Sequence, residues 1–129
     1  MTSMSGLTVR WSLVEAPDGA EQALADYVAE TSHARFSALA GLRFKTWRMR
    51  AGEWFEGCYV FGDDAARDEF QAAFTETAAE SPGSQLIGSP PVLIEPCTVV
   101  AVAEGVAGFA AAPRYEAGMG ATAAGTPPA

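Results

Sequence analysis

Residues 41–61 read Gly-Leu-Arg-Phe-Lys-Thr-Trp-Arg-Met-Arg-Ala-Gly-Glu-Trp-Phe-Glu-Gly-Cys-Tyr-Val-Phe, and they are the most informative part of the chain. Two strand-like runs flank Ala51-Gly52, which predicts a β-hairpin that turns at those residues. Because neighbouring strand residues point to opposite sides, one face of the first strand should carry Arg43, Lys45, Trp47 and Met49, and the other Leu42, Phe44, Thr46 and Arg48. Bulky groups and cations on both faces indicate a sheet that is covered on both sides and lines a cavity.

The segments around the hairpin predict the order strand, helix, strand, strand, helix, strand. Residues 7–14 alternate as a strand does, and residues 20–39 form an amphipathic helix whose cap is expected at Asp18. The inward positions expected on that helix are Ala20, Leu24, Tyr27, Val28, Thr31, Ala34, Arg35 and Ala38.

A second helix should start after Gly62, with Asp63 or Asp64 as its cap and with Ala65, Phe70, Ala73 and Phe74 inward. Residues 81–91 read as a loop around Leu86 and Ile87, and residues 92–103 as a last strand that Pro96 confines to an edge or a bulge.

This order is the ferredoxin-like βαββαβ arrangement, an α+β fold with the spatial strand order 4-1-3-2. We expect one domain over residues 1–104 and an Ala/Gly/Pro-rich C-terminal tail over residues 105–129. The sheet face away from the helices is too aromatic to stay wet, so we expect two sheets to pack face to face in a homodimer, a dimeric α+β barrel.

Composition and charge exclude several classes of function. The 129 residues are 49% hydrophobic and 19% charged, which is typical of a globular domain. The net charge of −8 and the lack of a basic run argue against nucleic acid as a partner. Neither a signal segment nor a membrane-spanning stretch is recognisable, so we expect a cytoplasmic protein. The two cysteines, Cys58 and Cys97, are expected to be free thiols.

The hairpin resembles the signature of the YdhR-like monooxygenase family, small dimeric α+β barrel proteins related to the cofactor-independent antibiotic-biosynthesis monooxygenases. The resemblance covers roughly residues 7–104 and falls on Gly41, Phe44, Lys45, Trp47, Gly57, Tyr59 and Phe61. Glu56 departs from the pattern, where a small residue is expected, and Arg43, Arg48 and Trp54 have no counterpart in it.

Read without the family, the residues favour an aromatic-walled cavity with a few ionisable groups. The chain has a single histidine and lacks the spacings of metal, dinucleotide and serine-hydrolase sites, so no cofactor and no metal are expected. The catalytic candidates are Lys45, Trp47, Glu56 and His33. The substrate-binding candidates are Trp11, Tyr27, Arg43, Phe44, Trp54, Tyr59 and Phe61, and Arg114 and Tyr115 of the tail are candidates to close the mouth of the pocket.

Each catalytic candidate also has a structural interpretation. Lys45 would hold an anion, unless it pairs or reaches the edge of the sheet. Trp47 is either a stacking surface or ordinary core. Glu56 is either a base or the partner of Arg10, Lys45 or Arg48 in a salt bridge across the sheet. His33 is either a general base or a solvent-facing helix residue.

These observations lead to three hypotheses for a pocket that takes an aromatic or polyketide-like small molecule. The first is cofactor-free oxygenation, in which a base removes a proton and the substrate anion reacts with O₂. The second is a cyclase or isomerase with the same pocket and base. The third is a non-catalytic binding protein.

Overall fold

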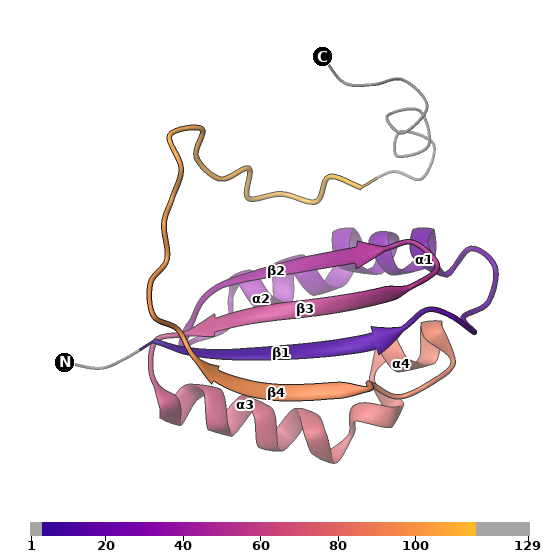
Figure 1. Ribbon diagram of the computed structural model, residues 1–129, viewed down its shortest axis with the longest axis horizontal. Helices are drawn as coiled ribbons and strands as arrows, with labels where there is room; N and C mark the ends of the chain where they lie inside the picture. Colours follow the sequence, from indigo (N-terminus) through magenta and orange to yellow (C-terminus); the bar gives the residue numbers. More distant parts are fainter. Residues whose placement is uncertain (1–3, 116–129) are drawn as a thin grey trace.

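The fold is the expected ferredoxin-like α+β fold, as a computed structural model that describes residues 4–115 shows (Figure 1). One four-stranded antiparallel sheet has the order β2-β3-β1-β4, which confirms the predicted order. The elements, in chain order, are β1 (Ser5–Ser12), α1 (Ala20–Tyr27), a π-helical turn η1 (Val28–Ser32), α2 (His33–Ser37), β2 (Leu42–Arg50), β3 (Trp54–Phe61), α3 (Asp64–Glu76), a 3-10 turn η2 (Ala78–Glu80), α4 (Pro82–Ile87) and β4 (Leu93–Thr98).

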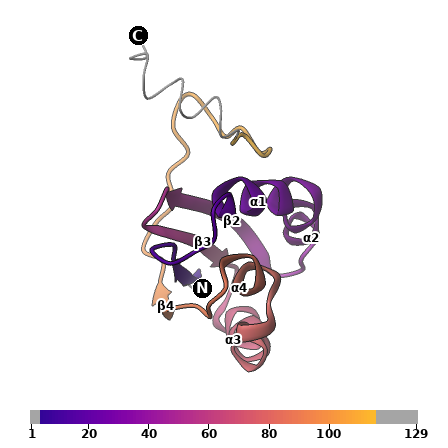
Figure 2. The same cartoon turned by 90° about the vertical axis from the view of Figure 1, so that its right-hand side faces the viewer.

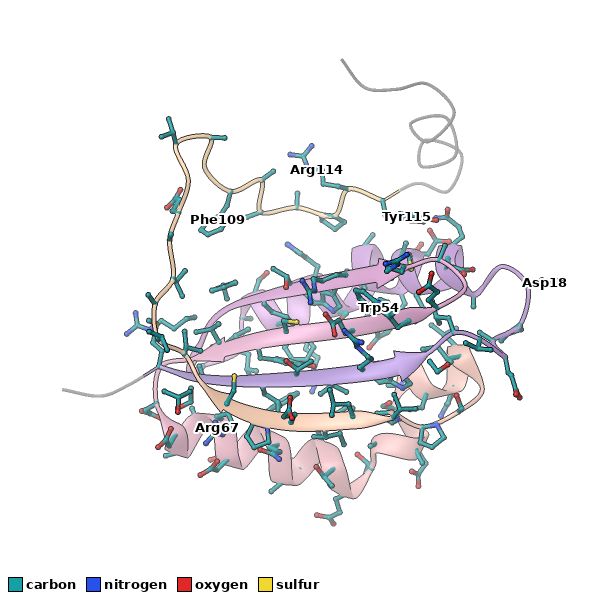
Figure 3. All side chains as sticks on the ribbon, in the orientation of Figure 1. Asp18, Trp54, Arg67, Phe109, Arg114 and Tyr115 are labelled. Carbon is teal, nitrogen blue, oxygen red and sulfur yellow. The ribbon has the colours of Figure 1, made fainter. Side chains whose placement is uncertain are left out.

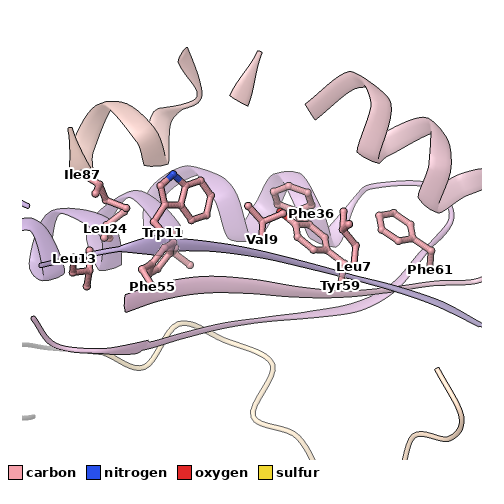
Figure 4. Packing of buried hydrophobic residues seen from close by; sticks show 11 residues of the cluster. Leu7, Val9, Trp11, Leu13, Leu24, Phe36, Phe55, Tyr59, Phe61 and Ile87 are labelled. Carbon is pink, nitrogen blue, oxygen red and sulfur yellow. The ribbon is translucent and has the colours of Figure 1, made fainter. Parts of the chain in front are cut away.

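All helices lie on one side of the sheet, and the opposite face carries none (Figure 2). We call that opposite face the open face. The core fills the space between the sheet and the helices (Figure 4). It is built from alternate residues of the central strands, which include Leu7, Val9 and Trp11 of β1 and Phe55, Tyr59 and Phe61 of β3.

The central hairpin forms as predicted, with its turn between Arg50 and Trp54. Gly52 has a positive φ of 76°, which favours glycine at this turn. The pairing slips between Leu42 and Phe44, where β2 is irregular. Alternation along β2 is therefore broken at its start and regular from Phe44 onward.

The first helix differs from the prediction in its cap and in its middle. Gly19, with φ 82°, stands at the N-cap, and no side chain caps the helix, so the expectation for Asp18 was wrong. A π-helical turn at Val28–Ser32 then joins α1 to α2. Because this turn is wider than an α-turn, Ser32 and Phe36 become buried, whereas Thr31, Ala34, Arg35 and Ala38 are exposed.

The second helix starts as predicted, because the Asp63 side chain accepts a hydrogen bond of 2.8 Å from the backbone N–H of Ala66. Phe70 and Phe74 pack against the core, as predicted. Ala65 and Ala73 are exposed, and Ala66 packs against the core instead of Ala65.

The segment expected as a loop contains the short helix α4. Ser81 caps it and Pro82 occupies its first turn, a combination typical of helix starts. Ile87 is buried in the core, and the Trp11 indole N–H donates a 2.9 Å hydrogen bond to Ser84 Oγ. The apolar pair Leu86-Ile87 is thus helical.

The last strand, β4, ends at Thr98 and is shorter than the predicted 92–103. It is an edge strand, as Pro96 requires, because a proline cannot donate to a strand ladder. Strand β1 separates it from β3, so Cys97 pairs opposite Gly6 and Cys58 opposite Thr8. Both cysteines are free, as expected.

Residues 99–115 form no helix or strand. They rise from the end of β4 and run along β2 at the other edge of the sheet (Figure 1). Phe109 lies with its ring centroid 6.1 Å from that of Phe44 (Figure 3). Most of the predicted tail, residues 116–129, lies outside the described residues. Within residues 4–115, no helix has the length and apolarity needed to cross a membrane.

Candidate functional site

A cavity of about 390 Å³ lies between the sheet and the helices. Its floor comes from β1, β2 and β3, and its walls from the helices and from the turn before α4. The lining side chains that matter below are Trp11, Tyr27, Arg35, Phe36, Lys45, Trp47, Tyr59, Phe70 and Phe74. Most of them are aromatic, so the cavity suits an apolar, planar molecule.

Lys45 is the cationic residue of β2 that lines this cavity, and its amine lies among aromatic rings. Its Nζ lies 3.5 Å from the ring centroid of Phe36, 4.4 Å from that of Trp47 and 4.3 Å from that of Tyr59. These are cation–π distances. The Lys45 side chain is partly buried and forms no ion pair with a carboxylate in residues 4–115.

The local sequence explains why the Lys45 stem can lie across the sheet. Lys45 pairs with Tyr59, and the next pair on this face is Trp47 with Gly57. A Cβ atom at Gly57 would come within 3.0 Å of Lys45 Cε and within 3.3 Å of the Tyr59 ring. The missing side chain of Gly57 therefore provides the space that the lysine occupies.

The surroundings of Lys45 weaken its charge. Burial lowers the pKa of the amine well below the ordinary value of 10.5, and the positive charge of Arg35 lowers that pKa further. The rings oppose part of this shift, because they favour the ammonium form. Burial also raises the pKa of the Tyr59 phenol, which keeps this neighbour protonated.

Five of the predicted site residues lie together at this cavity: Lys45, Trp47, Trp11, Tyr27 and Tyr59. The second catalytic candidate, Trp47, packs edge-to-face against Phe36, with ring centroids 6.0 Å apart. Their action on a substrate stays a prediction. Strand alternation accounts for the positions of Trp11, Lys45, Trp47 and Tyr59, whereas Tyr27 comes from α1.

His33 lines a second hollow, of about 580 Å³, on the other side of Lys45 and Trp47. Its ring centroid lies 5.9 Å from that of Trp47. Residues 110–115 of the C-terminal segment line this hollow, so Arg114 and Tyr115 lie beside a pocket next to β2 (Figure 3). That they close its mouth stays a prediction. Lys45 and Trp47 line both spaces.

Glu56 lies on the open face and not at the cavity. It is 1% exposed, and its carboxylate accepts a 2.9 Å hydrogen bond from Arg10 Nε and a 2.6 Å hydrogen bond from Arg48 Nε. Burial raises the pKa of Glu56, but the hydrogen bonds and charges of Arg10 and Arg48 outweigh it, so the pKa is lowered overall. Glu56 therefore forms the predicted salt bridge across the sheet, with Arg10 and Arg48 as its partners and not Lys45.

Four predicted substrate-binding residues do not line the cavity between sheet and helices. Trp54 and Phe44 lie on the open face, where Trp54 supports the Arg10 guanidinium at 4.4 Å (Figure 3). Arg43 is exposed at the irregular start of β2, which separates it from Lys45. Phe61 has the right parity but lies in the core, stacked on Tyr59 at 5.9 Å.

Several cavity residues were not predicted as site residues. Phe36 was missed because the π-helical turn changes which face of the helix meets the sheet. Arg35 was expected on the inward face but was not taken as a site residue. Phe70 and Phe74, four residues apart on α3, carried a helical signal but were interpreted only as core.

Within residues 4–115, no three or more His, Cys, Asp and Glu side chains form a group that could bind a metal ion.

Comparisons with known proteins give a fold but no family. No protein-family model matches the chain, and no curated protein does. A solved structure of a protein of unknown function from Nitrosomonas europaea is similar, with 27% identity and a TM-score of 0.56 over 81% of this chain and 97% of that one. Another, described as a "putative Antibiotic biosynthesis monooxygenase" from Chloroflexus aurantiacus, has 15% identity and a TM-score of 0.48 over 78% and 97%. The second similarity is too low to carry an argument about this chain.

Proposed function

We propose that this chain is an enzyme in which Lys45 removes a proton from an aromatic or polyketide-type molecule bound between the sheet and the helices. One observation carries the proposal. The Lys45 amine faces the cavity from among the rings of Phe36, Trp47 and Tyr59 and has no carboxylate partner in the described chain. An amine with a lowered pKa is neutral more often than an ordinary lysine, and a neutral amine can act as a base.

The cavity favours a planar apolar substrate. Its volume of about 390 Å³ is in the range of small-molecule sites, and Trp11, Trp47 and Phe74 provide flat walls. Tyr59, whose phenol stays protonated, can donate a hydrogen bond to a carbonyl or enolate oxygen of that substrate.

The reaction we propose is oxygenation without a cofactor. Removal of a proton gives a carbanion or enolate, which passes one electron to O₂, and the two radicals then combine. One oxygen atom stays on the substrate carbon as a carbonyl, and the other leaves as water. The apolar walls keep solvent from the radical pair. The resemblance of the hairpin to the YdhR-like monooxygenase family supports this choice.

An oxygen electrode tests the proposal with a panel of enolisable polycyclic phenols and ketones. We expect consumption of one O₂ per product and full activity after treatment with EDTA. Lys45→Met should slow turnover by about 100-fold or more, the usual contribution of a general base. Thr75→Ala, an exposed change on α3, serves as the control.

The other outcomes identify the alternatives. Turnover of the panel without oxygen uptake would replace oxygenation by cyclisation or isomerisation in the same pocket. Binding without any turnover would make the chain a small-molecule-binding protein and would overturn the proposal.

A further inference from the structure

Lys45 is the only lysine among the 129 residues, so the chain has a single side-chain amine. That amine lies in an aromatic enclosure of the kind described above, with Nζ within 4.4 Å of each of the three ring centroids. A lysine in such a place exposes little of its charge to water, and no neighbouring carboxylate holds it as an ammonium ion within residues 4–115.

The amine can be reached from two sides. Lys45 lines both the cavity of about 390 Å³ between sheet and helices and the hollow of about 580 Å³ under the C-terminal segment. A small molecule in either space lies against the same side chain. The open volume on both sides also leaves room for a carbinolamine, whose tetrahedral carbon is bonded to that nitrogen.

Charged and titratable groups reach the two spaces around Lys45 from several elements. Arg35 and His33 come from α2, Tyr27 from α1 and Tyr59 from β3, while the Cys58 thiol lies on the open face. Arg48, Arg114 and Tyr115 line the hollow under the C-terminal segment. Glu80 of η2 is the carboxylate that lines the cavity, and within residues 4–115 it forms no ion pair with Lys45. Burial and Arg35 lower the pKa of the amine, and each unit of that shift raises the neutral fraction at pH 7 about tenfold.

We propose that Lys45 Nζ is a nucleophile that forms an imine with aromatic aldehydes and ketones that enter this cavity. The neutral amine adds to the carbonyl carbon, a C–N bond forms, and the carbonyl oxygen takes up a proton to give a carbinolamine. The C–O bond then breaks, and the oxygen leaves as water with both hydrogens of the original amine. Amine and carbonyl compound thus give imine and water, with no oxidant or reductant. The inference rests on the same cavity and the same neutral amine as the proposed function, but it does not require oxygen.

Reductive trapping tests this inference directly. The full chain is incubated anaerobically at pH 7 with benzaldehyde and cyanoborohydride, and peptides are mapped by mass spectrometry. We expect one benzyl group on Lys45, added at least as fast as on the α-amino group of the same chain. That α-amino group is the internal reference, because its pKa of about 7.7–8.0 makes it the most reactive amine of an ordinary protein at this pH.

Denaturation and two variants complete the experiment. In denaturing urea, labelling of Lys45 should fall at least tenfold relative to the α-amino group, since the enclosure is lost. Arg35→Gln, which removes the positive charge that lowers the pKa of the amine, should lower the relative rate, whereas Thr75→Ala should not change it. Labelling that is confined to the α-amino group of the folded chain, or equal Lys45 labelling in folded and unfolded chains, would overturn the inference. If the imine is trapped on Lys45 but the oxygen electrode shows no uptake, only the proposed oxygenation is rejected. If oxygen is consumed but no imine is trapped, only the proposed imine is rejected.

Discussion

The Lys45 amine lies among three aromatic rings. From the sequence, the alternatives were a salt bridge or a side chain that extends to the edge of the sheet. Neither occurs within residues 4–115, because the stem lies over Gly57 and under Phe36. The position thus combines a polar atom with an apolar enclosure, which is common at sites that bind or transform ligands.

Trp47 and Lys45 should respond differently to substitution. Trp47→Phe should keep stability within about 1.5 kcal/mol but weaken binding or turnover. Lys45→Met keeps the apolar stem, so it should leave the melting temperature nearly unchanged while activity is lost. Both quantities are measured on the same preparations by thermal unfolding and by turnover. A strongly destabilised Trp47→Phe together with a fully active Lys45→Met would mean that this face is ordinary core.

Gly57→Ala tests the space that Lys45 needs. The added methyl group would stand 3.0 Å from Lys45 Cε, so the amine must shift within its ring enclosure. We expect at least a tenfold loss of turnover or of amine labelling, with a stability change of about 1–3 kcal/mol or less. Gly105→Ala is the matched control, since a Cβ there meets no atom within 4 Å. Wild-type labelling of Gly57→Ala would show that the space is not needed.

At the scale of the elements, Glu56 ties β3 to both of its neighbours. Its carboxylate binds Arg10 of β1 and Arg48 of β2, and the Arg side chains are 37% and 58% exposed while Glu56 is 1% exposed. The carboxylate is therefore the buried member of the cluster, and its loss should weaken the sheet.

The pH dependence of stability follows from this cluster. The folded-state pKa of Glu56 is lowered from 4.5, so its contribution is present above that value and is lost as the pH falls through the folded-state pKa. Glu56→Gln should lower the free energy of unfolding by about 1–3 kcal/mol at pH 7 and make it less sensitive to acid. Urea unfolding between pH 7 and pH 3 measures this. Glu53→Gln, in an exposed pair with Arg50, should change stability by no more than about 0.5 kcal/mol. Equal effects of the two changes would contradict the account.

The elements also show what the sequence could and could not predict. Alternation in β2 and β3 correctly placed Lys45, Trp47 and Tyr59 on one face, because a strand has a fixed period. The period of the first helix failed after Val28, since one wider turn is enough to bring Phe36 inward, and no propensity marks that turn. The irregular pairing at Leu42/Phe44 moved Arg43 away from Lys45 for a similar reason. The short helix α4 was not predicted, because its Pro, Gly and Ser residues are common both in loops and at helix starts.

In the whole molecule, the open face is the face of the sheet that no helix covers (Figure 2). It carries Trp54, Phe44 and Val60 around the Glu56 cluster. The C-terminal segment contacts this face through Phe109 and Phe44 and then passes along the β2 edge. A face of this kind fits a second copy of the same sheet, so the homodimer remains our prediction.

Light scattering at micromolar concentration tests the assembly. We expect a mass near twice 13.4 kDa. Thr46→Arg, which adds a cation at an exposed position near Arg48 on the open face, should shift the mass toward the monomer. Thr75→Arg on exposed α3 should not. A clean monomer for the unmodified chain would rule out the face-to-face barrel.

Burial and the charge of Arg35 favour the neutral form of the Lys45 amine, and nuclear magnetic resonance can measure this without a substrate. Because Lys45 is the only lysine, carbon-13 labelling of lysine gives one Cε resonance whose shift follows its protonation. We expect a titration midpoint well below 10.5, and a midpoint that moves toward that value when Arg35→Gln removes the neighbouring positive charge. A midpoint at the ordinary value of 10.5 in the folded, unmodified chain would contradict it.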